Sequence, residues 1–520
     1  MSQIKNPMLN TDSYKVSMWK QYPPGTESVF SYIESRGGRY DETVFFGLQM
    51  FIKEYLMTPF TQAQIDFADR FYKAHGEPFN REGWQAILDK YQGYLPVRIR
   101  GLKEGVVIKN QNALVTVENI DPEFYWVTTW VETALLRAVW YPVTVASQSF
   151  SIKRVIKRYL EETGDVAGLN FKLHDFGARG ATSLESAAIG GAAHLVNFLG
   201  SDTISGIVAL MEYYNSDVCG YSIPAAEHST ITSWLRENEV EAYRNMIKQF
   251  GGSFPLFAVV SDSYNVYEAG KIWGTVLYEA VRDSGSMLVV RPDSGDPATI
   301  VGGLDFEDVD NLDDYTLLNA RKTIVRNRED GKFYRAEGYD SGWTTKFDIE
   351  PLSEEEVKGM IGVLADNFGY DINEKGYKVL RNVRIIQGDG INEESIVEIL
   401  ENLTRGGWSA DNVAFGMGGA LLQQVNRDTN KFAMKCSAAK VDDEWRDVFK
   451  DPITDSGKRS KKGRLTTVER DGDFCTIRIE DLQAYEQDGW KDAMVVYYVA
   501  GKLMVDDNIG AIRERAASYL

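Results

Sequence analysis

The segment RIIQGDGINEESIVEILENL (384–403) decides the predicted fold. A short apolar run ends in glycine and aspartate, and a helix-like stretch follows it at once. Four further apolar runs end in small or polar residues in the same way: KLHDFGARG (172–180), FAVVSDSY (257–264), MLVVRPDSG (287–295) and NVAFGMGG (412–419). Such alternation is typical of a parallel sheet with crossover helices.

Five units of this kind favour a closed α/β barrel, whose active site lies at the carboxyl ends of its strands. The polar residues of the motifs stand at those ends. A doubly wound open sheet would give a similar pattern and remains the alternative fold. We expect the barrel to be the catalytic domain and to span residues 149–424.

The segments that flank the barrel have a different pattern. Residues 97–118 are rich in valine and isoleucine and are broken by Glu-Gly and Asn-Gln-Asn, which indicates short antiparallel strands. The chain becomes strand-rich again after about 425. We therefore expect residues 1–148 and 425–520 to form a second, β-rich α+β domain together.

Residues 304–355 interrupt the rhythm of the barrel. Six carboxylates lie among residues 305–314, and Asp330-Gly331 is a hairpin signal. We interpret this segment as an exposed insertion, and a regulatory role is the alternative.

Composition excludes several classes of protein. A net charge of −19 disfavours nonspecific binding to nucleic acid or to an anionic membrane. No run approaches the roughly 20 apolar residues of a membrane helix, and the first residues lack the apolar core of a signal peptide. Cys219, Cys436 and Cys475 are far apart in sequence, which indicates reduced thiols in the cytoplasm.

The glycine motifs GDG (388–390) and GMGG (416–419) are candidate phosphate cradles. Glycine lets the backbone approach a phosphate closely, and the helix that follows offers free N–H groups. Glycine also simply ends strands, so each motif alone is weak. Their equivalent positions after two buried strands favour phosphate binding.

Charged residues at other strand ends could carry chemistry. His228 stands at a probable helix start and could act as a base or as a nucleophile toward phosphorus. Arg291 could hold a phosphate or a carbonyl, and Asp293 a metal ion or a hydroxyl, but the two could also form a structural ion pair. Asp262 is a further carboxylate, or else the cap of the next helix.

The segment KDPITDSGKRSKKGRL (450–465) places five cations within seven positions. It is either a solvated basic loop or a loop that neutralises a pyrophosphate.

Taken together, the motifs resemble the nicotinamide phosphoribosyltransferases, which are type II phosphoribosyltransferases. The resemblance covers nearly the whole chain in order, through TDSYKVSMWKQYPPGT (11–26), LHDFGARG, LVNFLGSDT, GYSIPAAEHSTITSW, VVSDSY, RPDSG, IQGDG, AFGMGG and KDPITDSGKRSKKGRL. It implies an irregular seven-stranded α/β barrel joined to a β-rich domain. It also implies a head-to-tail homodimer whose active sites lie between the subunits.

The reaction that the resemblance implies joins nicotinamide to 5-phosphoribosyl 1-pyrophosphate, giving nicotinamide mononucleotide and pyrophosphate. Magnesium would assist through Asp293. ATP hydrolysis through a phosphorylated histidine would favour the forward direction. That histidine would be His228, supported by Glu227 and Asp262.

The resemblance also assigns the base-binding residues. Phe176 and the partner subunit's Tyr14 would enclose the pyridine ring, since stacking suits a neutral ring and a pyridinium alike. Asp202 would accept from the carboxamide NH2, and Arg291 would hold the carboxamide oxygen. Two further substrate-binding positions are Asp12 and Ser222.

The donor would be held by glycines and by basic groups. Asp293, Gly388 and Asp389 would contact the ribose and its phosphate, Gly418 and Gly419 the 5′-phosphate, and Arg179 the pyrophosphate. The basic groups expected to reach across the dimer are Arg36, Arg427, Lys435, Lys450 and Lys458.

Two positions depart from the family pattern. Ala258 and Ala433 stand where serines are expected near the amide and the 5′-phosphate, and each loss would remove a hydrogen bond of about 0.5–1.5 kcal/mol.

Three other functions remain as alternatives. A nicotinate phosphoribosyltransferase would keep the fold, but Asp202 would repel its carboxylate substrate. The others are a phosphosugar aldolase or isomerase and a noncatalytic interaction protein.

Overall fold

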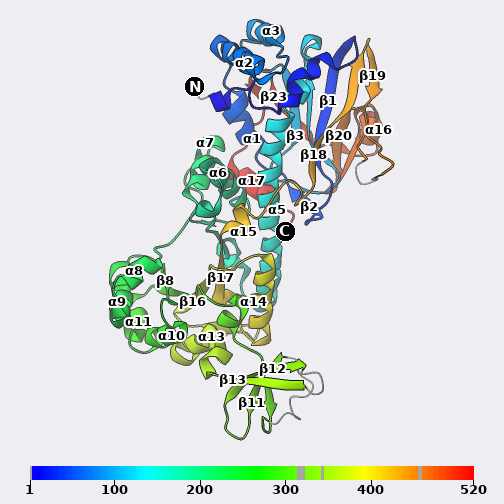
Figure 1. Cartoon of the computed structure of the whole chain (residues 1–520). Helices are drawn as coiled ribbons and strands as arrows, with labels where there is room; N and C mark the ends of the chain where they lie inside the picture. Colours follow the sequence, from blue (N-terminus) through cyan, green and yellow to red (C-terminus); the bar gives the residue numbers. More distant parts are fainter. Residues whose placement is uncertain (1–2, 313–321, 341–344, 455–458) are drawn as a thin grey trace.

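The computed structural model describes residues 3–312, 322–340, 345–454 and 459–520. Figure 1 shows a parallel barrel between a large antiparallel sheet above and a small sheet below. The long helix α5 (Glu132–Thr163) runs from the large sheet to the barrel.

Six parallel strands form the barrel sheet in the order β7-β6-β17-β16-β9-β8. Their bounds are β6 Leu173–Asp175, β7 Gly200–Ser201, β8 Leu256–Val260, β9 Met287–Arg291, β16 Val383–Gln387 and β17 Val413–Met417. Tyr221 forms a parallel bridge with Gly200 of β7, and Ala225 one with Ala258 of β8. The segment from Tyr221 to Ala225 thus links the two edge strands. This confirms the predicted irregular α/β barrel and excludes the open sheet.

The barrel strands are apolar because both of their faces are covered. Val259, Val290 and Ile385, for example, have no exposed surface. The helices around them include α6 Leu184–His194, α7 Ile204–Tyr213, α10 Val266–Gly274, α11 Tyr278–Ser284, α12 Pro297–Gly302, α13 Glu354–Phe368 and α14 Glu393–Arg405. Polar residues that lie between a strand and its helix are left at the rim of the barrel.

The antiparallel sheet has the order β19-β18-β1-β5-β3-β23-β24. Its strands are β1 Thr26–Ser35, β3 Val97–Leu102, β5 Ala113–Asn119, β18 Phe432–Val441, β19 Glu444–Asp447, β23 Met494–Val499 and β24 Lys502–Leu503. Strand β1 pairs with β5 on one side and β18 on the other. The two ends of the sequence therefore share one sheet, which we call the β-rich region together with α2 (Gln62–His75) and α3 (Arg81–Tyr91).

Two helices connect the β-rich region to the barrel. The expected domain boundary at residue 148 falls inside α5, which is continuous from residue 132 to 163. The C-terminal helix α17 (Ile509–Ala517) packs Ile509 and Ile512 into the core of the barrel. Arg513 of this helix donates to the carbonyl oxygens of Leu195 and Cys219 at 2.6 and 2.9 Å.

The insertion forms a small sheet that projects from the barrel (Figure 1). Its strands, in the order β10-β11-β12-β13, are β10 Glu307–Val309, β11 Lys322–Asn327, β12 Phe333–Asp340 and β13 Thr345–Leu352. The expected hairpin at Asp330-Gly331 joins β11 to β12. The last carboxylates of the acidic run, Asp313 and Asp314, lie outside the described residues.

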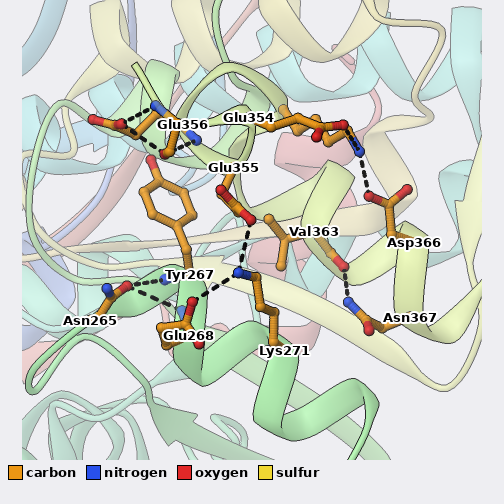
Figure 2. Close-up of polar contacts among 12 residues, drawn as sticks. Asn265, Tyr267, Glu268, Lys271, Glu354, Glu355, Glu356, Val363, Asp366 and Asn367 are labelled. Carbon is orange, nitrogen blue, oxygen red and sulfur yellow. Dashed lines mark hydrogen bonds and ion pairs between the residues drawn. The ribbon is translucent and has the colours of Figure 1, made fainter. Parts of the chain in front are cut away.

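The two stems of the insertion meet at the barrel. The amide of Leu304 donates to the carbonyl of Val357 at 2.8 Å. A Cβ atom added to Gly359, whose φ is +65°, would lie 2.2 Å from the amide nitrogen of Gly303. Figure 2 shows how α13 is then held on α10, where Lys271 bridges Glu268 and Glu355 at 2.8 Å each.

Replacing Gly359 with alanine should therefore destabilise the barrel. An alanine there would suffer both an unfavourable backbone conformation and a collision with backbone, together about 1–3 kcal/mol. We expect the melting temperature of Gly359→Ala to fall by several degrees in a thermal melt. Gly331→Ala is the matched control, because Gly331 has a φ of +73° but no atom within 4 Å of an added Cβ. Equal shifts in the two variants would show that the close approach of the stems is unimportant.

Candidate functional site

The ring of Phe176 lies on bare backbone at the rim of the barrel. Phe176 follows β6, and its amide donates to the carbonyl of Met417 at 3.0 Å. A Cβ atom added to Gly416 would lie 1.9 Å from the Phe176 ring, and one added to Gly388 3.3 Å from it. The two glycine motifs thus support an aromatic ring. Local sequence gave no signal for this contact, because it joins three separate strands.

A cavity of about 670 Å³ lies within the barrel beside this ring. It brings together six predicted site residues: Phe176, Arg179, Asp202, Ser222, Glu227 and Arg291. Apolar side chains, among them Ala258 and Val289, form much of its wall. A planar apolar ring would fit such a wall, and the polar groups would orient it.

The same cavity extends to the amino ends of the strands, where Lys172 and Arg384 line it. Sequence reasoning did not select these two residues. Lys172 donates to the carbonyls of Ala410, Asp411 and Val413 at 2.9–3.0 Å. Burial lowers the pKa of Lys172 to about 8.

Asp202 is held in place from two sides. Its carboxylate accepts from the Ser222 hydroxyl at 2.5 Å, and its amide donates to the carbonyl of Asp175 at 2.9 Å. This leaves carboxylate oxygen capacity for a donor inside the cavity. A ligand N–H group would satisfy it, whereas a ligand carboxylate would be repelled.

Arg291 and Asp293 pair with each other at the end of β9. The guanidinium donates to both carboxylate oxygens, at 3.2 and 2.8 Å. Each side chain is 18% exposed, so a substrate can reach either one only by competing with this pair. Asp293 also lies beside Gly388, since a Cβ atom there would be 3.1 Å from its Oδ1.

His228 and Asp262 form the second polar pair of the rim. Nε2 of His228 lies 3.0 Å from Oδ1 of Asp262. The histidine is 44% exposed, whereas the aspartate is only 5% exposed. Asp262 does not cap the next helix, because the side chain of Asn265 accepts from the first-turn amides of α10 (Figure 2). The buried carboxylate can therefore orient the imidazole and stabilise positive charge on it.

The two glycine motifs differ in the helices that follow them. GDG precedes Asn392, which caps the 13-residue helix α14. GMGG leads into a single helical turn, α15 (Gly419–Leu422), so the helix expected after it is only four residues long. Gly419 has no atom within 4 Å of an added Cβ, and a Cβ at Gly418 would meet only the carbonyl oxygen of Phe176 at 3.8 Å. The side chain of Asp389, which follows strand β16, is exposed.

The remaining predicted residues that the structure describes lie in or beside the β-rich region, and they do not line the first cavity. A second cavity of about 210 Å³ is lined by Arg36, Arg427, Lys435 and Lys450, together with Glu132. Burial lowers the pKa of Lys435, and the neighbouring cations Arg36, Lys450 and Arg427 lower it further. We call this the basic cavity, and its charge suits an anion. Sequence reasoning missed Glu132, which opens a helix without any local motif.

Tyr14 and Asp12 belong to the same region. Tyr14 is 61% exposed, and Asp12 accepts from the hydroxyl of Thr133 at 2.6 Å. Neither residue lines the barrel cavity. One chain thus carries its predicted site residues in two separate groups.

The cations of the 450–465 segment are largely neutralised within the chain. Arg459 pairs with Asp451, Lys461 with Glu34, Lys462 with Asp447 and Arg464 with Glu480. These four cations therefore do not form a free basic cluster. Lys450 lines the basic cavity, and Lys458 lies outside the described residues.

Two family models match the sequence. The model of the nicotinate phosphoribosyltransferase (NAPRTase) family matches residues 171–487. The model of the nicotinamide phosphoribosyltransferase N-terminal domain matches residues 6–99. Together they cover the barrel strands and part of the β-rich region.

Curated relatives match over the full length. A nicotinamide phosphoribosyltransferase of Xanthomonas campestris pv. campestris (strain 8004) is 48% identical over 99% of this chain and 99% of its own. One of Acinetobacter baylyi is 30% identical over 100% of this chain and 99% of its own.

Solved structures show the same fold at low identity. Nicotinate-nucleotide pyrophosphorylase from Pyrococcus furiosus has a TM-score of 0.58 at 13% identity, covering 100% of this chain and 96% of that one. Human nicotinic acid phosphoribosyltransferase has a TM-score of 0.50 at 15% identity, covering 98% of this chain and 93% of that one.

Within the described residues, no helix is both long and apolar enough to cross a membrane.

Asp175, which lies behind both Phe176 and Asp202, should make stability depend on pH. It is fully buried, and its Oδ1 accepts from the amide of Gly177 at 2.7 Å. Burial raises the pKa of Asp175 from 3.8 to about 6. The folded state therefore binds the proton more tightly than the unfolded state, and stability falls as pH rises from about 4 to 6.

Asp175→Asn should remove this dependence, because the amide oxygen can still accept from Gly177. In urea unfolding, the variant should gain up to about 3 kcal/mol relative to wild type between pH 4 and 7. A difference between the two proteins that stays constant over this range would show that Asp175 does not titrate there.

Proposed function

The chain belongs to the nicotinate phosphoribosyltransferase (NAPRTase) family and, within it, to the nicotinamide phosphoribosyltransferases, and we propose that it joins nicotinamide to 5-phosphoribosyl 1-pyrophosphate at the barrel rim. The products are nicotinamide mononucleotide and pyrophosphate. The observation that carries this proposal is the cavity that both Phe176 and Asp202 line.

The base is bound by stacking and by one charged acceptor. The Phe176 ring packs against the pyridine ring, and this contact strengthens as the ring nitrogen gains positive charge on forming the new C–N bond. The Asp202 carboxylate accepts from the carboxamide NH2, while Ser222 keeps the carboxylate in place. Arg291 would meet the carboxamide oxygen when it exchanges from Asp293.

The donor needs both groups of residues. Asp293, Gly388 and Asp389 offer a carboxylate and bare backbone to the ribose, and Gly418 and Gly419 offer backbone to the 5′-phosphate. The four cations of the basic cavity are suited to the phosphate groups, but they lie in the β-rich region of the same chain. We therefore propose a homodimer in which the basic cavity and Tyr14 of one subunit complete the barrel site of the other.

Magnesium fits as a partner of the donor rather than as a resident ion. Among the described residues, no group of three or more His, Cys, Asp or Glu side chains could hold a metal ion by itself. Mg2+ commonly binds through one or two carboxylates plus substrate phosphates, and Asp293 is the carboxylate placed to contribute here. The ion would supply charge neutralisation on the departing pyrophosphate.

ATP is the proposed co-substrate of His228. Because Nε2 faces Asp262, an imidazole that donates from Nε2 carries its lone pair on Nδ1. Attack by Nδ1 on the terminal phosphorus would form the N–P bond as the bond to the ADP oxygen breaks, and Asp262 would stabilise the imidazolium. Glu227, at the cavity wall, would assist at the same strand end.

The free state of Cys219, Cys436 and Cys475 supports a reducing, cytoplasmic compartment.

Base preference tests the reaction directly. The wild type should form nicotinamide mononucleotide from nicotinamide and 5-phosphoribosyl 1-pyrophosphate, and it should use nicotinate at least about 100-fold less well, because like-charge contact costs several kcal/mol. Asp202→Asn should narrow this ratio by about tenfold or more. Both rates are read as mononucleotide by chromatography. No product from either base would refute the function, and an unchanged ratio in the variant would refute the charge explanation.

His228 is tested through ATP. His228→Ala should abolish ATP hydrolysis and leave a slow transfer reaction, because base and donor contacts remain. Radiolabelled ATP should leave an acid-labile phosphoryl group on wild type and none on the variant. Undiminished ATP hydrolysis in His228→Ala would exclude this role.

A further inference from the structure

A buried lysine stands directly behind Tyr14. Lys15 lies on the 3-10 helix η2 (Ser13–Lys20) and is 4% exposed. Its Nζ lies 2.6 Å from Oε2 of Glu132 and 5.1 Å from the centroid of the Tyr14 ring. A buried ammonium is unfavourable unless it is paired. The position of Lys15, and with it the helix that carries Tyr14, therefore depends on Glu132.

Glu132 also faces the basic cavity. It is the first residue of α5, and its side chain is 28% exposed. Among the described residues that line this cavity it is the one carboxylate, opposite Arg36, Arg427, Lys435 and Lys450. Its charge raises the pKa of Lys435 against the larger effect of burial. One carboxylate thus stands between Lys15 on the inside and the anion-binding cations on the outside.

Two further contacts fix the Tyr14 segment to the same place. The Thr11 hydroxyl donates to the carbonyl of Trp130 at 2.9 Å, and the Thr133 hydroxyl donates to Asp12 at 2.6 Å. With the Lys15–Glu132 pair, residues 11–15 are attached to residues 130–133 at three points. The exposed ring of Tyr14 is therefore held at one register relative to the wall of the basic cavity.

We propose that Lys15 and Glu132 are positioning residues that couple the Tyr14 ring to the basic cavity, so that base and donor are held at a fixed separation. This inference rests on the proposed function, in which Tyr14 stacks on the base and the basic cavity holds phosphate groups. Lys15 has a second effect, because it occupies the Glu132 carboxylate. Without it, that carboxylate would pair with Arg36 or Lys435 and compete with the phosphate.

Substitutions of Lys15 and of Glu132 should change the Michaelis constant for the donor in opposite directions. Lys15→Met should raise the Michaelis constants for both nicotinamide and 5-phosphoribosyl 1-pyrophosphate by about tenfold, a typical effect of leaving a charged partner unpaired. Glu132→Gln should raise the constant for nicotinamide but lower that for the donor, because it removes the negative charge from the cavity. Lys15→Met/Glu132→Gln should return the donor constant to the wild-type value or below it, while the constant for nicotinamide stays raised.

Calorimetric binding of inorganic pyrophosphate gives a readout without turnover. Pyrophosphate should bind about tenfold more weakly to Lys15→Met and more tightly to Glu132→Gln. Lys20→Met is the matched control, since Lys20 is exposed on the same helix and should change neither constant. Thermal melts identify any variant that does not fold. If Lys15→Met is unfolded, Glu132→Gln still tests the charge effect, because a glutamine can accept from Lys15.

The results separate failure of the inference from failure of the function. Wild-type protein that forms no mononucleotide would refute the proposed function, whatever the variants do. Active wild type with folded variants whose constants and pyrophosphate affinity match it would overturn the positioning role. Glu132→Gln that binds pyrophosphate no more tightly than wild type would overturn the competition between Glu132 and phosphate.

Discussion

The barrel rim is organised around the ring of Phe176, which packs where side chains at two glycine positions would otherwise lie. The ring of Phe176 lies against the backbone of Gly416 and Gly388, and a single added carbon at Gly416 would collide with it. Gly388 also touches Asp293, so the surface that would receive the base and the surface that would receive the sugar meet at one residue. The backbone of Gly388 therefore limits where the Phe176 ring and the Asp293 carboxylate can lie.

Charge is divided between the two regions of the chain. The barrel rim presents the carboxylates of Asp202, Asp262 and Asp293 together with Arg179 and Arg291, whereas the basic cavity beside the β-rich region is lined by four cations and one carboxylate. In a chain with a net charge of −19, this separation keeps the cations from being neutralised by the carboxylates of the rim. Substitutions that change anion binding and substitutions that change base recognition can therefore occur in different regions of the chain.

The sequence predicted what is local and missed what is distant. Apolar runs that end in glycine or aspartate correctly predicted the barrel strands and the polar residues at their carboxyl ends. This was possible because the end of a strand and the start of the next helix lie within a few residues of each other. The cations after residue 450 could not be judged in the same way. Lys461 is neutralised by Glu34, which lies 427 positions earlier, and Asn265, not Asp262, caps α10. Such partners become neighbours only when the fold is complete.

The contact between Gly303 and Gly359 has a consequence for how this protein can change. The chain leaves the barrel at Gly303 and returns to it at Gly359, and these two residues are in contact. The sheet between them is therefore an insertion whose two ends meet. Loop-closure entropy grows only slowly with loop length. Evolution could therefore enlarge, exchange or delete this inserted sheet without disturbing the barrel, as long as Gly303 and Gly359 are retained.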